Sequence, residues 1–139
     1  MGAVVSIIPE AFEALAAEAL KGVDGGISIE REERRATVVS FGLGSEPRVA
    51  VSVVWTVNGV RTKVTEVRAA VRERLEMQRL DYRHRAQRWE ESAKRRRNPE
   101  NRALDAACAA RFRKSEASIG GLLNAFDTLW PEGWTGGES

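Results

Sequence analysis

The sequence predicts an α+β fold: an N-terminal helix, a four-stranded antiparallel β-meander and a long antiparallel helical hairpin. Apolar residues recur at helical spacing near the N-terminus, alternate with polar residues around a central Asn-Gly pair, and return to helical spacing over the second half. The length of 139 residues corresponds to one domain. We assign residues 1–130 to this domain and the glycine-rich residues 131–139 to a flexible tail.

The first helix is expected over residues 9–21. Pro9 suits the first turn of a helix, where its missing N–H costs nothing. The apolar residues that follow at helical spacing are Phe12, Leu15, Ala16, Ala19 and Leu20. Gly22 and the Asp24-Gly25-Gly26 group end the helix.

The sheet is expected over residues 27–65, and its clearest strand is Arg48–Val57, in which apolar residues alternate. Asn58-Gly59 is a strong signal for a two-residue hairpin turn, because a type I′ turn needs φ > 0 at both positions. Such a turn places three pairs opposite each other: Val57 and Val60, Trp55 and Thr62, and Val53 and Val64. We expect the apolar face of this sheet to be covered by the first helix and by the start of the second.

Two further strands are expected before Arg48. Ile27 and Ile29 alternate with polar residues, and so do Thr37, Val39 and Phe41. The charged tract Glu30–Arg35 between them is interpreted as a hairpin turn.

The helical hairpin is expected over residues 66–97 and 99–129. Thr65 is a candidate N-cap for its first helix, and Asn98-Pro99 ends that helix because the residue before a proline disfavours the α conformation. Gly120-Gly121 predicts a break in the second helix. The first helix carries a thin apolar stripe made of Val67, Val71, Leu75, Gln78, Tyr82 and Trp89.

Charge is concentrated on the first helix of the hairpin. The net charge of the chain is +2, but residues 66–97 carry eleven basic and six acidic side chains. Interleaved carboxylates favour a solvated face laced with ion pairs. The alternative is a nucleic-acid-binding surface whose arginine forks contact phosphates. That surface would consist of Arg88, Lys94, Arg95, Arg96, Arg97 and Arg102.

The sequence contains few of the cysteines, histidines and motifs that catalytic or metal-binding sites use. The sequence has one cysteine and one histidine, and neither a nucleotide-binding loop nor a zinc motif occurs. Cys108 is in register with Leu104 and Phe112, which predicts a packed core thiol, and His84 is expected at the surface. We therefore expect no enzyme activity, no cofactor and no metal site.

The leading hypothesis is a non-catalytic protein–protein interaction or assembly module. It would form a homo-oligomer or join a larger protein assembly, docking through its helical hairpin and the tryptophans near its C-terminus. The candidate docking residues are Tyr82, Trp89, Trp130 and Trp134, because exposed tryptophans are common interface anchors.

Location and origin follow from composition. A lone cysteine suits a reducing compartment, and no apolar run reaches ~18 residues, so we expect a cytoplasmic protein with no membrane partner. The excess of arginine over lysine, 18 against 4, is associated with the GC-rich genomes of many bacteria and their phages.

Overall fold

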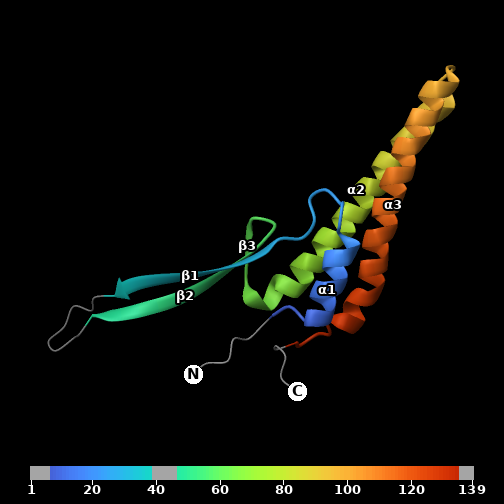
Figure 1. Ribbon diagram of the computed structural model, residues 1–139. Helices are drawn as coiled ribbons and strands as arrows, with labels where there is room; N and C mark the ends of the chain where they lie inside the picture. Colours follow the sequence, from blue (N-terminus) through green and yellow to red (C-terminus); the bar gives the residue numbers. More distant parts are fainter. Residues whose placement is uncertain (1–6, 39–46, 135–139) are drawn as a thin grey trace.

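The computed structural model describes residues 7–38 and 47–134. Figure 1 shows two long projections that leave a central body in widely different directions: a two-stranded β-ribbon, and the far half of a helical hairpin. In chain order the elements are α1 (Glu10–Ala19), β1 (Ile29–Val38), β2 (Arg48–Val57), β3 (Val60–Thr62), the 3₁₀ helix η1 (Val64–Glu66), α2 (Val67–Arg95) and α3 (Pro99–Leu129).

The described residues form a three-stranded antiparallel sheet with the order β1-β2-β3, so the predicted four strands are not present. β1 is one unbroken strand, with Ile29 opposite Val57 at one end and Val38 opposite Arg48 at the other. The tract Glu30–Arg35, predicted as a hairpin turn, lies inside this strand. Charged side chains are compatible with the strand because all six side chains of this tract are exposed, whereas the turn prediction assumed a sheet with one buried face.

The predicted strand over 37–41 starts within β1, and its residues 39–41 lie outside the described residues. The Asn58-Gly59 turn is confirmed: φ is 50° at Asn58 and 81° at Gly59. Val57 pairs with Val60 and Trp55 with Thr62, as predicted. The third predicted pair does not form, because β3 ends at Thr62 and the chain then turns into η1.

The two long helices form the predicted antiparallel hairpin. α2 begins at Val67, one residue after the predicted start, and Glu66 rather than Thr65 occupies the N-cap position. Asn98 caps α3, because its side-chain oxygen accepts a hydrogen bond of 2.8 Å from the Glu100 N–H. α3 continues through Gly120-Gly121 without the predicted break, and the stem of Arg79 on α2 lies beside Gly120. Packing along α2 thus outweighs the low helix propensity of two glycines.

The hydrophobic core lies where α1, α2, α3 and the base of the ribbon meet. The largest fully buried side chains are Phe126, Leu75, Ile119, Leu122, Val67 and Val71. α1 adds Phe12 and packs against α3. Only the base of the ribbon reaches this core, through Ile29, Trp55 and Val57. The expectation that helices cover the apolar face of the sheet is therefore wrong for the outer ribbon.

Hydrogen bonds fix the connection between α1 and β1 to its surroundings. The Gly26 carbonyl oxygen accepts from Gln78 Nε2 at 2.8 Å and from Asn58 Nδ2 at 3.0 Å. The Tyr82 hydroxyl donates to the Asp24 carbonyl oxygen at 2.8 Å. Ser28 N–H donates to Asn58 Oδ1 at 3.1 Å. The base of the ribbon is thereby anchored to α2 and to the β2–β3 turn.

Candidate functional site

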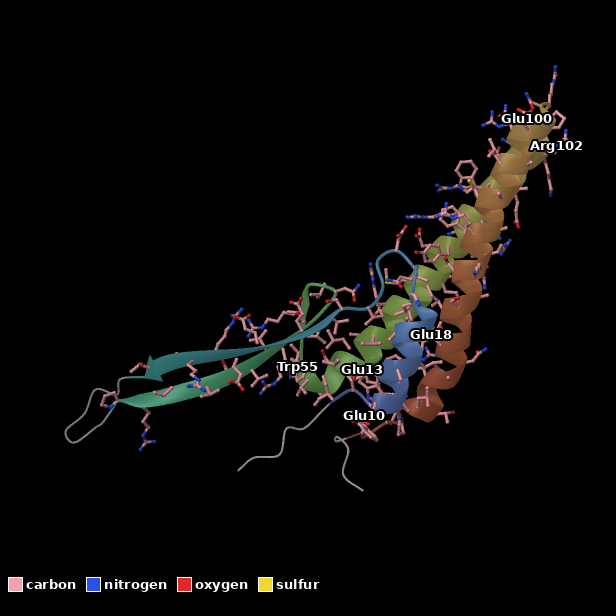
Figure 2. The ribbon with its side chains drawn as sticks, viewed as in Figure 1. Glu10, Glu13, Glu18, Trp55, Glu100 and Arg102 are labelled. Atoms are coloured by element: carbon pink, nitrogen blue, oxygen red, sulfur yellow. The ribbon has the colours of Figure 1, made fainter. Side chains whose placement is uncertain are left out.

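The outer ribbon carries an exposed apolar surface, the valine stripe, defined as Val49, Val51 and Val53 on β2. Their side chains are 64%, 56% and 42% exposed. They share one face because side chains two residues apart along a strand point the same way. Trp55 and Val57 continue this row into the core, and Figure 2 shows Trp55 where the ribbon meets the helices. The row that contains the stripe thus begins in the core at Val57 and Trp55 and continues along β2 into solvent.

The ribbon is a locally unsupported structure. Among the described residues, β3 pairs only with Trp55, Thr56 and Val57, so the rest of the ribbon they form consists of two strands. A two-stranded hairpin is at best marginally stable in water, and stable sheets normally bury one face. Sequence reasoning missed this surface because an alternating valine strand is typical of a buried sheet face.

Two of the predicted docking residues lie inside the protein. Trp130 is 3% exposed, and its ring centroid lies 5.3 Å from that of Phe12 and 5.7 Å from that of Phe126. Arg68 Nε donates to the Trp130 carbonyl oxygen at 2.6 Å. Tyr82 is also buried in the core cluster. Neither side chain is available on a docking surface, because their apolar rings complete the core.

The other two predicted docking residues are half-buried. Trp134 packs against the core cluster, and residues 135–139 of the predicted tail lie outside the described residues. Trp89 lies on α2 beyond the sheet and lines a pocket shared with α3. Of the four aromatic residues singled out from the sequence, Trp89 and the buried Tyr82 line this pocket.

The predicted phosphate-binding residues gather at the tip of the helical hairpin, defined as residues 94–102, with Arg88 about two turns before it. Figure 2 shows Arg102 at this far end. Two members of the set have internal partners: Arg96 pairs with Asp105 at 3.0 Å, and Arg102 donates to the Arg96 carbonyl oxygen at 3.0 Å. Among the described residues, no carboxylate oxygen lies within 4.0 Å of the remaining four, which are Arg88, Lys94, Arg95 and Arg97.

The outer half of the hairpin is held by small side chains and polar contacts. Ala86, Ala93 and Ala109 are buried there, whereas Leu104, predicted to pack, is 64% exposed. Asp105 is 5% exposed and accepts from the Ser92 hydroxyl at 2.6 Å as well as from Arg96. The sequence around Asp105 contains leucine and alanine residues and no motif that would predict a buried carboxylate bound to Ser92 and Arg96.

Ion pairs shift the acidity of this region. The Ser92 hydrogen bond, followed by Arg96, lowers the pKa of Asp105. Arg113 lowers the pKa of Glu90, and Arg83 followed by Arg113 lowers the pKa of Glu116. All three carboxylates are therefore held in the charged form, which suits structural ion pairs and not proton transfer at neutral pH.

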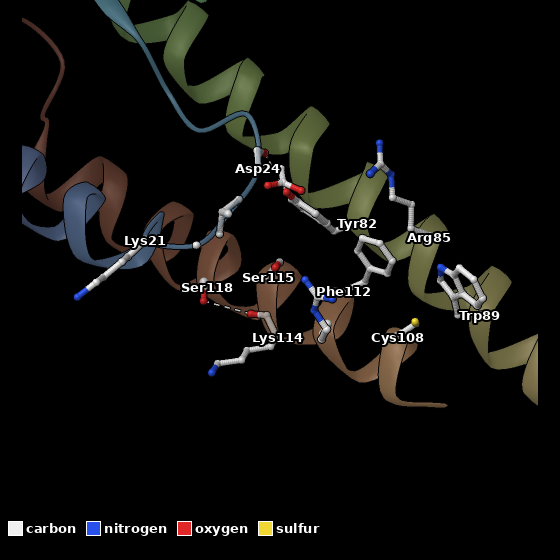
Figure 3. A pocket seen from close by; sticks show the side chains of 13 residues that line it. Lys21, Asp24, Tyr82, Arg85, Trp89, Cys108, Phe112, Lys114, Ser115 and Ser118 are labelled. Atoms are coloured by element: carbon white, nitrogen blue, oxygen red, sulfur yellow. Dashed lines mark hydrogen bonds between the residues drawn. The ribbon is translucent and has the colours of Figure 1, made fainter. Parts of the chain in front are cut away.

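The pocket at Trp89, of about 440 Å³, lies between α2, α3 and the loop Lys21–Asp24. Figure 3 shows Tyr82, Phe112 and Trp89 arranged along the two helices, with Cys108 near Trp89. Cys108 is half-buried on this wall, so the prediction of a packed core thiol is wrong. Arg85, Arg111 and Lys114 add cationic groups to the lining. His84 is exposed, as predicted.

Within residues 7–38 and 47–134, no group of three or more His, Cys, Asp or Glu side chains could hold a metal ion. In the same part of the chain, no helix is long and apolar enough to cross a bilayer. No protein-family model, curated protein or solved structure matches this chain.

Proposed function

We propose that this protein is a non-catalytic assembly module that self-associates through its β-ribbon. The observation that carries the proposal is the valine stripe on a ribbon that projects away from the helices (Figure 1). Exposed contiguous apolar surface is typical of protein contact sites. Docking is thereby assigned to the ribbon, and the helical hairpin holds the base of the ribbon in place.

Charge favours a second copy of the chain as the partner. β1 carries three glutamates and three arginines, so its formal charge is zero. On the stripe face β1 presents Arg31, Glu33 and Arg35, which lie opposite Trp55, Val53 and Val51. Both signs of charge are therefore present beside the stripe, so Glu33 of one copy can pair with an arginine of the other. Packing the valine stripes of two copies against each other would remove six partly exposed valine side chains from water, which is favourable by the hydrophobic effect.

The test replaces the stripe by Val49→Thr, Val51→Thr and Val53→Thr together. Threonine keeps the β-branched shape that suits a strand but is much more polar. The matched control is Met77→Gln, Leu80→Gln and Leu104→Gln, which alters three exposed apolar residues on the helices. Light scattering should show a mass above 15.4 kDa for the wild type and the control, and a monomer for the threonine variant.

A cross-linking experiment tests the geometry directly. In a Cys108→Ser background, Val51→Cys should form a disulfide-linked dimer on mild oxidation, because Val51 is the middle residue of the stripe and lies at the two-fold axis when two stripes pack antiparallel. Ser52→Cys, on the opposite face of the same strand, should not cross-link efficiently. A wild-type protein that stays monomeric at millimolar concentration, with no Val51→Cys cross-link, would contradict self-association through the ribbon.

Nucleic-acid binding at the tip of the hairpin is the second candidate. It is favoured by the four cations without carboxylate partners among the described residues: Arg88, Lys94, Arg95 and Arg97. Binding through several phosphates should weaken steeply as salt concentration rises. Arg95→Gln with Arg97→Gln should abolish it while leaving the Arg96–Asp105 pair intact. Binding that survives both substitutions would exclude the tip.

A further inference from the structure

The pocket at Trp89 combines two kinds of lining that serve different parts of a ligand. One part is aromatic. Trp89 and Phe112 are half-buried, so their rings pack on the protein and are also reachable from the cavity. The Tyr82 ring lies 5.9 Å from that of Phe112, and its hydroxyl is held by Asp24, which makes it a fixed floor. Aromatic faces of this kind stack against planar groups.

The other part of the lining is cationic. Lys21, Arg85, Arg111 and Lys114 line the cavity. Among the described residues of the lining, Asp24 is the one acidic residue, which leaves a formal charge of +3. The Arg85 guanidinium stands 5.8 Å from the centre of the Phe112 ring and pairs with Asp81. No carboxylate oxygen of the described residues lies within 4.0 Å of Lys21, Arg111 or Lys114. Their charges are therefore not neutralised by these neighbours.

The loop that closes one side of the pocket is held in position. Tyr82 binds the Asp24 carbonyl and Gln78 binds the Gly26 carbonyl, so the segment after Lys21 is attached to α2 at two points. A wall fixed in this way loses less conformational entropy when a ligand binds. The volume of about 440 Å³ lies within the range of about 300–1,000 Å³ that small-molecule sites occupy.

We infer that this pocket binds a nucleotide: the aromatic walls take the base, and Arg85 and Arg111 take the phosphate. A phosphate alone would not use the aromatic rings, and an uncharged planar molecule would leave the cations unmatched. The same base–phosphate chemistry could come from a free mononucleotide or from one unit of a single strand. A second open cavity beyond Trp89, lined by Arg85, Arg88, Trp89 and Ser92, continues the basic surface toward the tip.

The first experiment measures binding of adenosine monophosphate to the full chain by calorimetry, with adenosine and inorganic phosphate as its fragments. Adenosine monophosphate should bind about tenfold or more tightly than either fragment, because only the whole molecule engages both linings. Absence of binding at millimolar concentration, or equal binding of inorganic phosphate alone, would overturn the proposal.

The second experiment uses Phe112→Leu and Arg111→Gln. Leucine keeps an apolar side chain at position 112 but removes the ring, and Arg111 is exposed, so its replacement leaves the fold unaffected. Each should weaken binding of adenosine monophosphate about tenfold. Arg61→Gln, an exposed arginine on β3 outside the lining of the pocket, is the matched control and should leave the affinity unchanged. Arg111→Gln keeps the test valid even if Phe112→Leu does not fold. Wild-type affinity for adenosine monophosphate in Arg111→Gln would overturn the assignment.

An oligonucleotide of thymidylate units distinguishes the two sources of the ligand. If the pocket holds one unit of a strand, the oligonucleotide should bind more tightly than the mononucleotide and lose that affinity in Arg111→Gln. If the pocket takes free nucleotides, the oligonucleotide should bind no better than the mononucleotide. Oligonucleotide binding that Arg97→Gln weakens and Arg111→Gln does not, without mononucleotide binding, would overturn the pocket assignment in favour of the tip.

Discussion

Arg113 on α3 and Glu90 on α2 form a two-point ion pair, with Nε–Oε2 and Nη2–Oε1 distances of 3.2 and 2.8 Å. The remaining nitrogen of Arg113 donates to Glu116 at 2.9 Å, and Arg83 donates to the other oxygen of Glu116 at 2.6 Å. These contacts link the helices where the buried apolar side chains are small. Polar contacts therefore contribute more to the outer hairpin than to the core.

Acid should loosen the outer helical hairpin before it unfolds the core. The pKa values of Glu90, Glu116 and Asp105 are lowered in the folded protein, so these groups stabilise it above their unfolded-state pKa of about 4. That stabilisation is lost as the pH falls through the lower folded-state values. Hydrogen exchange should show protection of residues 83–116 falling as the pH drops below the unfolded-state pKa of about 4, while Leu75 and Ile119 stay protected.

The control for this prediction is the double variant Glu90→Gln with Glu116→Gln. Its outer hairpin should be less protected at neutral pH, and its protection should depend less on pH because two of the three titrating groups are gone. Equal pH dependence in the variant and the wild type would show that these carboxylates are not responsible.

Phe126→Ala should destabilise the protein by about 3–5 kcal/mol, because it removes a fully buried ring in contact with Phe12 and Trp130. Leu104→Ala, on the same helix, is the control and should change the free energy of unfolding by less than about 0.5 kcal/mol, because Leu104 is mostly exposed. Chemical denaturation measures both. Similar losses in the two variants would contradict the placement of the core.

Alanine substitutions at two glycines should have opposite effects. Gly59 has φ of 81°, and alanine in that conformation costs about 1–2 kcal/mol, so Gly59→Ala should lower stability. Gly121 is exposed within α3, and a Cβ there meets no heavy atom within 4 Å, so Gly121→Ala should raise stability by about 0.5–1 kcal/mol. A loss of stability in Gly121→Ala would argue against the continuous helix.

The ionisation of Tyr82 reports directly on the pocket floor, because the chain contains one tyrosine. Burial, followed by the Asp24 carboxylate, raises the pKa of Tyr82 above its ordinary value of 10.0. Ultraviolet titration should show phenolate forming only above that value. The neutral form is favoured in the folded state, so this stabilisation is complete below the unfolded-state pKa and lost as the pH rises through the folded-state value. Ordinary titration of the phenol would show that the floor is open to water.

The hairpins were predictable from sequence because their signals are local. Asn58-Gly59 specifies a turn that few other residue pairs adopt, and Asn98-Pro99 both ends one helix and caps the next. The course of α3 through Gly120 was not predictable, because its contact with Arg79 depends on a residue that is distant in sequence.

The candidate sites were harder to predict than the hairpins. Alternation at Val49, Val51 and Val53 identifies a common face but does not say whether anything covers it. Trp130 looked like an anchor because tryptophans are common at interfaces, yet Phe12 and Phe126 enclose it. The pocket at Trp89 joins three segments far apart in the sequence, so only the fold brings Lys21 near it.

The ribbon and the tip of the helical hairpin lie at opposite ends of the molecule (Figure 1). A 31-residue helix spans about 46 Å and a 10-residue strand about 33 Å. If one molecule bound the ribbon and another bound the tip, the lengths of these two elements would set the distance between the two bound molecules. Inserting seven residues into each of α2 and α3 would lengthen that distance by about 10 Å and keep the same side chains facing each other. In a periodic array, the length of the helical hairpin would thus determine the spacing between molecules, and a longer hairpin would increase that spacing without changing the contacts at either end.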